Sequence, residues 1–165
     1  MRESRENAIL RCSEGLFMKN GYNRATMRQI AEAADVSLGL ATYHFNSKRH
    51  IALRIMDTYL RFLKTKLSSA VSQKNEPLLH SASMVRLCIK FFMTPPRRNF
   101  YLECLELDIY IESIQNLGNE AIPNIVRHQG IDESPDMMLL FDNYIPPSVE
   151  KIIILEKEKG NFKGI

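Results

Sequence analysis

Two helix-capping signals close together constrain the fold of this chain more than any other feature of its sequence. Thr26 is followed three residues later by Gln29, a capping-box pattern in which the Thr hydroxyl accepts from the Gln amide while the Gln side chain reaches back. Apolar residues keep helical spacing over 27–34, and Asp35-Val36-Ser37 then interrupts the helix, since Asp tolerates a left-handed turn and Ser suits an N-cap. A further short helix is predicted over 38–44. The sequence therefore predicts two short helices joined by a tight turn, the pattern of a helix-turn-helix.

Helical spacing of apolar side chains continues on both sides of this pair. Residues 4–20 form a predicted first helix that stops at Gly21, a typical residue after a helix end. After Ser47, an apolar stripe predicts a long amphipathic helix over 48–73, and its members are Leu53, Met56, Tyr59, Leu60, Leu63, Leu67 and Val71. Alternation with a period of two, which marks a half-buried strand, is absent from the sequence. We therefore expect an all-α fold that begins with a three-helix unit.

Further helices are predicted in the second half of the chain. One apolar face ends at Pro95-Pro96. Another, running from Phe100 to Ile114, ends at Gly118, and its members are Phe100, Cys104, Leu107, Ile111 and Ile114. Shorter helices are expected over 120–128, from a cap at Ser134-Pro135, and after Pro146-Pro147.

Composition excludes several classes of protein. The 165 residues are 45% hydrophobic, which suits one globular domain or two small ones sharing a core. Three cysteines cannot pair completely, so we expect a reducing environment and a cytoplasmic location. The longest apolar runs are as short as Met137–Phe141, far below the roughly 18 residues of a membrane span. The N-terminus also lacks the apolar core of a signal peptide, and we expect no membrane partner.

Charge is divided unevenly along the chain. Residues 1–98 hold 17 Lys and Arg against 7 Asp and Glu, a net charge of +10, whereas residues 99–165 hold 5 against 12, a net charge of −7. Such a division suggests that the N-terminal part meets a polyanion. Solvated helix faces are the alternative explanation.

The first 55 residues resemble the N-terminal domain of the TetR family of bacterial transcription regulators. The resemblance rests on landmarks that occur in one order without insertions: Ile9-Leu10, Cys12-Ser13, Leu16-Phe17, Gly21-Tyr22, Thr26, Ile30-Ala31, Ala34, Val36-Ser37, Gly39, Tyr43-His44-Phe45 and Ser47-Lys48. Ser13, Asp35 and Thr42 depart from the residues that are common in the family. The resemblance implies a helix-turn-helix DNA-binding domain at 1–47 and a helical regulatory and dimerisation domain at 48–165, with 48–73 as the connecting helix. Family members usually continue into further dimerisation helices, so we expect this chain to lack part of the C-terminal region.

Ten residues of the N-terminal part are the candidates for DNA contact: Thr26, Arg28, Ser37, Leu38, Gly39, Leu40, Thr42, Tyr43, His44 and Lys48. Hydroxyls and amides at a helix start, as at Thr26, suit a phosphate, although a plain N-cap has the same sequence. Arg28 can contact a phosphate or guanine, or remain solvated. If Ala41 and Phe45 pack inward, Leu38 and Leu40 project outward and can meet thymine methyls, unless one of them belongs to the core.

The remaining candidates are expected to fix the register on the DNA backbone. Either Thr42 or Tyr43 makes the backbone contact, and His44 donates to a phosphate or satisfies a backbone carbonyl. Lys48 begins the long helix with Arg49 beside it, and both are expected to face phosphates. Gly39 allows close approach, at a cost in helix propensity of about 0.8–1.0 kcal/mol.

The C-terminal part offers apolar material for a small-molecule effector but no signature. Seven residues are the candidate lining of an effector pocket: Met84, Cys88, Phe91, Phe92, Tyr101, Cys104 and Leu105. A simple core has the same helical stripes. Cys88 and Cys104 are expected to be inert core residues, because nothing nearby in the sequence favours a thiolate.

The sequence thus predicts a homodimeric repressor that binds a pseudo-palindromic operator on double-stranded DNA and is released by a small effector. The alternative is a protein-binding adaptor that keeps its helix-turn-helix but does not bind DNA. We expect no enzymatic activity, no cofactor and no metal, because His44, His50, His80 and His128 lack metal-ligand spacing and no nucleophile or phosphate-loop motif is present. The acidic residues Glu103, Glu106, Asp108 and Glu112 are expected to form a solvated helix face.

Overall fold

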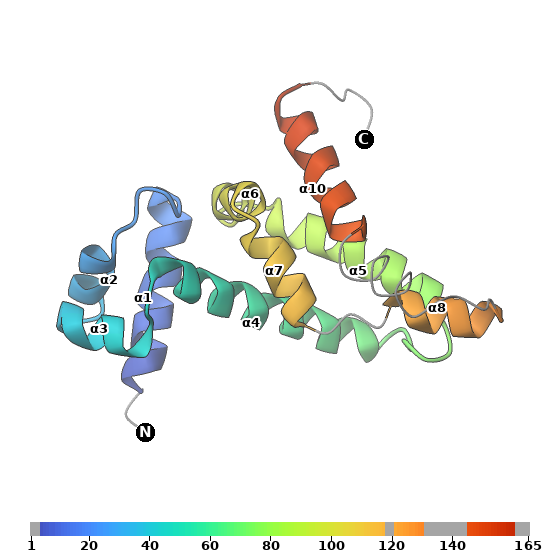
Figure 1. The fold of residues 1–165 in the computed structure, drawn as a ribbon, viewed down its shortest axis with the longest axis horizontal. Helices are drawn as coiled ribbons and strands as arrows, with labels where there is room; N and C mark the ends of the chain where they lie inside the picture. Colours follow the sequence, from blue (N-terminus) through green and yellow to red (C-terminus); the bar gives the residue numbers. More distant parts are fainter. Residues whose placement is uncertain (1–3, 118–120, 131–144, 161–165) are drawn as a thin grey trace.

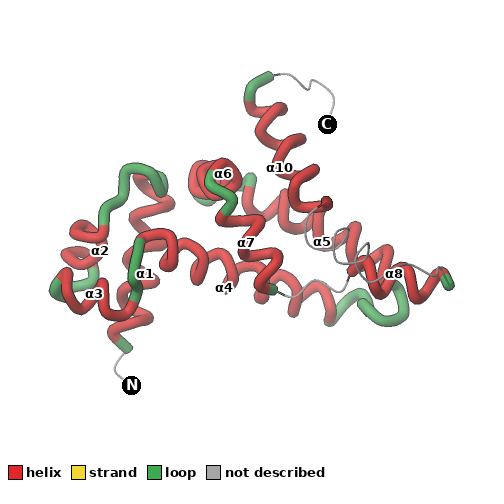
Figure 2. The backbone as a smooth tube through the Cα atoms, in the orientation of Figure 1, coloured by secondary structure: helices red, strands yellow, loops and turns green. Residues whose placement is uncertain are grey.

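A computed structural model describes residues 4–117, 121–130 and 145–160, and helices are its regular elements (Figures 1 and 2). The helices are α1 (Arg5–Asn20), α2 (Met27–Ala33), α3 (Leu38–His44), α4 (Lys48–Ser68), α5 (Pro77–Phe92), α6 (Arg98–Glu106), α7 (Ile109–Asn116), α8 (Ala121–Gln129) and α10 (Ile145–Glu158). Throughout these described ranges the chain contains no strand, and the predicted all-α fold is confirmed. None of the described helices combines the length and the apolar character needed to cross a bilayer.

Helices α1, α2 and α3 gather at one end of the molecule, and α4 leads away from them as the longest helix (Figure 1). Helix α4 packs against α1, α5 and α7, while α5 also packs against α8. Helix α6 contacts α1, α7 and α10. Helix α6 therefore contacts α1 directly, so the N-terminal helices are joined to the rest of the chain through α6 as well as through α4.

The three N-terminal helices begin and end where their local signals predict. Ser4 caps α1, and Gly21 follows α1 with a φ of 83°, a backbone conformation that favours glycine. At α2 the Thr26 amide donates to Gln29 Oε1 at 2.9 Å and the Gln29 amide donates to Thr26 Oγ1 at 3.2 Å, which completes the capping box. Asp35 takes a φ of 52° in the turn, and Ser37 caps α3. The helices predicted at 4–20, 27–34 and 38–44 are confirmed to within a residue.

Helix α4 is shorter than the sequence predicts. The predicted helix over 48–73 ends at Ser68, with Ser69 as its C-cap. Past Ser68 the chain continues in turn bonds, with the Ala70 and Val71 amides both donating to the Leu67 carbonyl at 2.9 and 2.8 Å. The Ser69 hydroxyl also donates to the Lys66 carbonyl at 2.7 Å. Val71 consequently lies outside the helix whose stripe it was expected to extend.

The apolar face predicted from Phe100 to Ile114 belongs to two helices instead of one. Helix α6 ends at Glu106 and α7 begins at Ile109, with Asp108 between them at a left-handed φ of 58°. Leu107, expected on the buried stripe, is 40% exposed. The apolar side chains keep their helical spacing across the break, so the sequence pattern does not reveal it. Asp is one of the few residues other than glycine that adopts the left-handed conformation.

The last predicted helices are found in part. Helix α8 matches the prediction over 120–128, and α10 starts at Ile145 with Pro146 and Pro147 in its first turn, where the missing amide hydrogens cost nothing. A helix predicted from Ser134-Pro135 lies outside the described residues.

Candidate nucleic-acid interface

The helix pair α2 and α3 is held on the molecule by one buried face. Ile30 and Ala31 of α2, Ala41 of α3 and Phe45 after it are at most 3% exposed. They pack into a core that includes Ile9 of α1, and Val36 lies partly buried against it. Because this face is used for packing, the opposite face of α3 is turned to solvent.

The outward face of α3 carries apolar and aromatic side chains that the core does not use. Tyr43 is 81% exposed and Leu38 is 42% exposed. Gly39 lies beside them, and a Cβ placed there would have only Ser37 Oγ, at 4.0 Å, within reach. The protein itself therefore does not require glycine at this position.

The other candidates lie on α2 and α3 or at the N-caps of these helices. Thr26, Arg28, Ser37 and Thr42 are exposed, whereas Leu40 and His44 are half-buried. The alternative that Leu38 is a core residue is not supported by its exposure.

The hydroxyls of Thr26 and Ser37 already take part in capping. Thr26 accepts from the Gln29 amide and Ser37 accepts from the Leu40 amide at 3.1 Å. The ring of His44 lies edge-on to the ring of Tyr43, with their centroids 5.5 Å apart. Nine of the ten candidates lie on α2, on α3 or at the N-caps of these helices, and we call this set the α3 surface: Thr26, Arg28, Ser37, Leu38, Gly39, Leu40, Thr42, Tyr43 and His44.

Lys48, the tenth candidate, has its ammonium group turned toward the protein. Its Nζ donates to the carbonyls of Tyr22 at 2.8 Å, Ala25 at 2.9 Å and Asn23 at 3.4 Å, and it lies 4.1 Å from the centroid of the Tyr22 ring. These three carbonyls match the three hydrogens of an ammonium group. Burial lowers the pKa of Lys48, opposed by the charge of Glu103. Lys48 therefore fastens the start of α4 to the loop between α1 and α2.

The acidic residues expected to form a solvated face are divided among separate partners. Glu103 accepts from the Tyr22 amide, Glu112 pairs with Arg49 at 2.7 Å, and Asp108 pairs with Lys151 at 2.6 Å. Arg49, expected to face phosphates, also donates to the Leu107 carbonyl at 2.8 Å. The sequence offered no signal for these pairs, because the partners come from distant parts of the chain. Among the described residues no group of three or more His, Cys, Asp or Glu side chains is placed to hold a metal ion.

Most of the seven candidates for an effector pocket pack in a single aromatic and apolar cluster. The rings of Phe92 and Tyr101 stack with centroids 4.9 Å apart, and Tyr110 of α7 lies edge-on to both. Cys88, Phe92, Tyr101, Cys104 and Leu105 are at most 1% exposed, while Met84 and Phe91 are half-buried. Burial raises the pKa of the Cys104 thiol well above its usual value, which disfavours a reactive thiolate.

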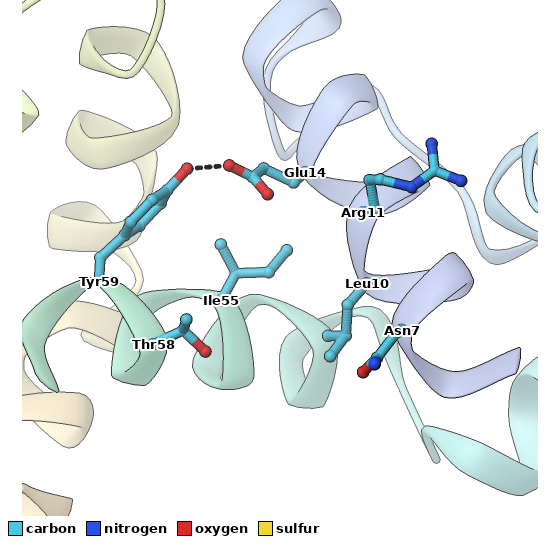
Figure 3. A pocket seen from close by; sticks show the side chains of 7 residues that line it. All are labelled: Asn7, Leu10, Arg11, Glu14, Ile55, Thr58 and Tyr59. Atoms are coloured by element: carbon cyan, nitrogen blue, oxygen red, sulfur yellow. Dashed lines mark hydrogen bonds between the residues drawn. The ribbon is translucent and has the colours of Figure 1, made fainter. Parts of the chain in front are cut away.

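A groove of about 270 Å³ lies elsewhere, between α1 and α4 (Figure 3). Its lining is Asn7, Leu10, Arg11, Glu14, Ile55, Thr58 and Tyr59. The Tyr59 hydroxyl donates to the Glu14 carboxylate across one end of the groove (Figure 3). On its other side the Tyr59 ring contacts Phe91 and Phe92, so this side chain joins α1 to the aromatic cluster. Sequence reasoning placed Tyr59 on the α4 stripe but gave no indication of this bond.

Fold and site together define an all-helical protein with an N-terminal helix-turn-helix unit. Residues 9–55 match the family model described as bacterial regulatory proteins, tetR family. The HTH-type transcriptional regulator QacR of Staphylococcus aureus is 36% identical over 52 residues, which cover 32% of this chain and 28% of that protein. Residues 9–55 are therefore similar to the N-terminal segment that characterises the tetR family of bacterial regulatory proteins, and the chain spans less than a third of the length of the regulator it matches.

Solved structures share the fold over nearly the whole chain. Thermus thermophilus FadR, a TetR family transcriptional repressor in complex with lauroyl-CoA, has a TM-score of 0.63 at 18% identity, covering 97% of this chain and 96% of that one. The multidrug binding protein EbrR in complex with ethidium has a TM-score of 0.58 at 16% identity, covering 96% and 90%. At these identities the likeness concerns the fold.

Proposed function

We propose that this protein is a transcriptional repressor that binds a pseudo-palindromic DNA operator as a homodimer and releases it when a small effector binds. The observation that supports the proposal most directly is the α3 surface. Tyr43, Leu38 and Gly39 are exposed on a helix that packs into the core through Ala41 and through Phe45 after it. An α-helix of this kind fits the major groove of B-DNA, where two recognition helices of a dimer lie about 34–36 Å apart.

Within this proposal the residues have different roles. Tyr43, His44, Thr42, Thr26 and Ser37 bind phosphate oxygens and fix the register, because their hydroxyl or ring N–H groups donate without any sequence preference.

Arg28, Leu38, Leu40 and Gly39 face base edges. Arginine pairs with guanine, leucine methyls contact thymine methyls, and the glycine lets the backbone approach. Lys48 contributes by holding the loop that leads to Thr26 in place.

The effector is proposed to enter the aromatic cluster formed by α5, α6 and α7. Its candidate contacts are Met84, Cys88, Phe91, Phe92, Tyr101, Cys104 and Leu105. Aromatic and thiol side chains suit a largely apolar ligand. FadR with lauroyl-CoA and EbrR with ethidium are relatives in fold whose ligands have extended apolar parts. An effector works only if it binds one arrangement of the DNA-binding helices better than the other.

The test is selection of bound fragments from the genome of the source organism, followed by affinity measurements at several salt concentrations. We expect an enriched palindrome and an affinity that falls steeply with salt, by a slope of about −0.9 for each neutralised phosphate. Tyr43→Phe is expected to weaken binding to the selected fragment. Replacement of Leu40 is expected to change which sequence is bound; an equal loss on all sequences would instead mean that Leu40 acts as a packing residue.

The competing function is a helical protein-binding adaptor that does not bind DNA. The exposure of Tyr43 and Leu38 is compatible with a protein partner, because aromatic residues are enriched at protein interfaces. Absence of any enriched palindrome would favour the adaptor and refute the repressor.

A further inference from the structure

The loop between α1 and α2 is held from two sides by helices that follow it in the chain. Its carbonyls at Tyr22, Asn23 and Ala25 accept from Lys48 at the start of α4. Its amides at Tyr22 and Asn23 donate to the two carboxylate oxygens of Glu103 in α6. The backbone that precedes α2 is therefore bonded to both α4 and α6.

The contact of Glu103 with this loop is closely fitted. A Cβ on Gly21 would lie 3.0 Å from each of the Glu103 carboxylate oxygens, so any larger residue there would require the carboxylate to shift by a few tenths of an ångström. Below the carboxylate, the ring of Phe100 in α6 stacks on Phe17 of α1 with centroids 5.2 Å apart. A polar contact and an apolar contact together join α6 to the end of α1.

Glu103 is also well placed to respond to the aromatic cluster. Tyr101 lies two residues before Glu103 on α6, and this spacing puts the two side chains on nearly opposite sides of the helix. Tyr101 is fully buried against Phe92 and Tyr110, while Glu103 reaches the loop. A rotation or shift of α6 at Tyr101 therefore acts directly on the bonds of Glu103, which weaken steeply once their geometry is lost.

We propose that Glu103 is a positioning residue that fixes the orientation of the DNA-binding helices relative to α6 and thereby sets the operator spacing that the dimer accepts. This inference rests on the proposed function and specifies its regulation. With Glu103 in place, α2 and α3 follow α6 as one body. Without it, the N-terminal helices keep their fold and their DNA contacts but lose the fixed angle to the rest of the protomer.

The experiment uses the full chain and three variants, Glu103→Ala, Glu103→Gln and the control Glu106→Ala. Glu106 lies on the same helix, has the same charge and is exposed. The DNA probes are duplexes built from the half-site found by genomic selection, with the two half-sites at the selected spacing or moved apart or together by one and two base pairs. A duplex with a single half-site completes the set, and thermal unfolding shows that each variant is folded.

Glu103→Ala is expected to flatten the spacing preference by about fivefold or more while leaving affinity for the single half-site unchanged. Glu103→Gln, which keeps one oxygen acceptor but no charge, is expected to fall between the wild type and Glu103→Ala. Amide hydrogen exchange at Tyr22 is expected to accelerate by about tenfold or more in Glu103→Ala, since a bond to a charged acceptor is lost. Glu106→Ala is expected to match the wild type in every measurement.

Three outcomes would overturn the inference. Accelerated exchange with an unchanged spacing preference would make Glu103 a merely structural residue. An equal change of affinity on all duplexes, including the single half-site, would show an effect of charge on DNA binding instead of positioning. Unaltered exchange at Tyr22 would refute the contact itself. A wild-type protein without any enriched operator would instead refute the proposed function, and that failure is recognised before any variant is measured.

Discussion

Substitution of Gly39 by alanine should make the protein more stable and weaken its binding to DNA. Gly39 is the second residue of α3 and has an ordinary helical backbone, so an alanine can adopt its conformation without strain. A Cβ there would meet no protein atom closer than Ser37 Oγ at 4.0 Å, which is ordinary contact. The fold therefore gains nothing from the glycine that offsets its poor helix propensity.

The two expected effects have separate magnitudes. Alanine in place of glycine stabilises a helix by about 0.5–1 kcal/mol, and for a chain of this size such a gain raises the unfolding temperature by about 1–4 °C. If DNA lies against Gly39, an added methyl group overpacks the contact at a cost of about 1–3 kcal/mol, which weakens binding roughly 5- to 150-fold.

Thermal unfolding and fluorescence anisotropy on the selected duplex measure both effects on one sample. Gly15→Ala is the matched control, because Gly15 lies in the exposed interior of α1 and a Cβ there would also meet nothing within 4 Å. The control should gain stability and bind DNA as the wild type does. A destabilised Gly39→Ala would refute the argument from open space, and a stabilised Gly39→Ala with unchanged affinity would refute close approach of DNA to α3.

Three further predictions concern buried polar contacts. Lys48→Met removes the donors to three carbonyls of the loop after α1 and should lower the free energy of unfolding by about 1–2 kcal/mol in urea titrations; no change would mean that water satisfies those carbonyls equally well. Tyr59→Phe leaves the Glu14 carboxylate without its hydroxyl donor and should cost about 1 kcal/mol in the same assay, whereas an unchanged midpoint would show that the bond is not formed in solution. Burial lowers the pKa of His80 below its ordinary value, so the unfolded chain takes up the proton first and stability is lost as pH falls below about 6.5. His80→Gln should flatten this dependence between pH 7.5 and pH 5.5, and an unaltered slope would assign it to other groups.

Local signals explain why the N-terminal helices were predictable. The capping box at Thr26, the Ser37 cap and the glycine after α1 act over three or four residues, so they can be recognised in the sequence without knowledge of the fold. The outward position of Leu38 followed in the same way, once Ala41 and Phe45 were assigned to the core.

Contacts between distant segments explain what the sequence did not reveal. Glu103 and Tyr22 are 81 residues apart, and nothing in either segment indicates the other. Lys48 could be recognised as a cation near the helix-turn-helix, but the three carbonyls that bind it meet only in the folded loop. The break before α7 was missed for a different reason, since the apolar spacing continues through Asp108 even though the helix does not.

The fit of the Glu103 carboxylate above Gly21 limits how freely the parts of this protein can be recombined. A chimera that takes residues 1–47 from a relative receives a foreign loop after α1 without the residue at position 103 that binds that loop in its own protein. Any side chain at position 21 meets both the carboxylate and a φ of 83°. A functional exchange of the N-terminal helices should therefore also exchange the residue at position 103, although it lies far from them in the sequence.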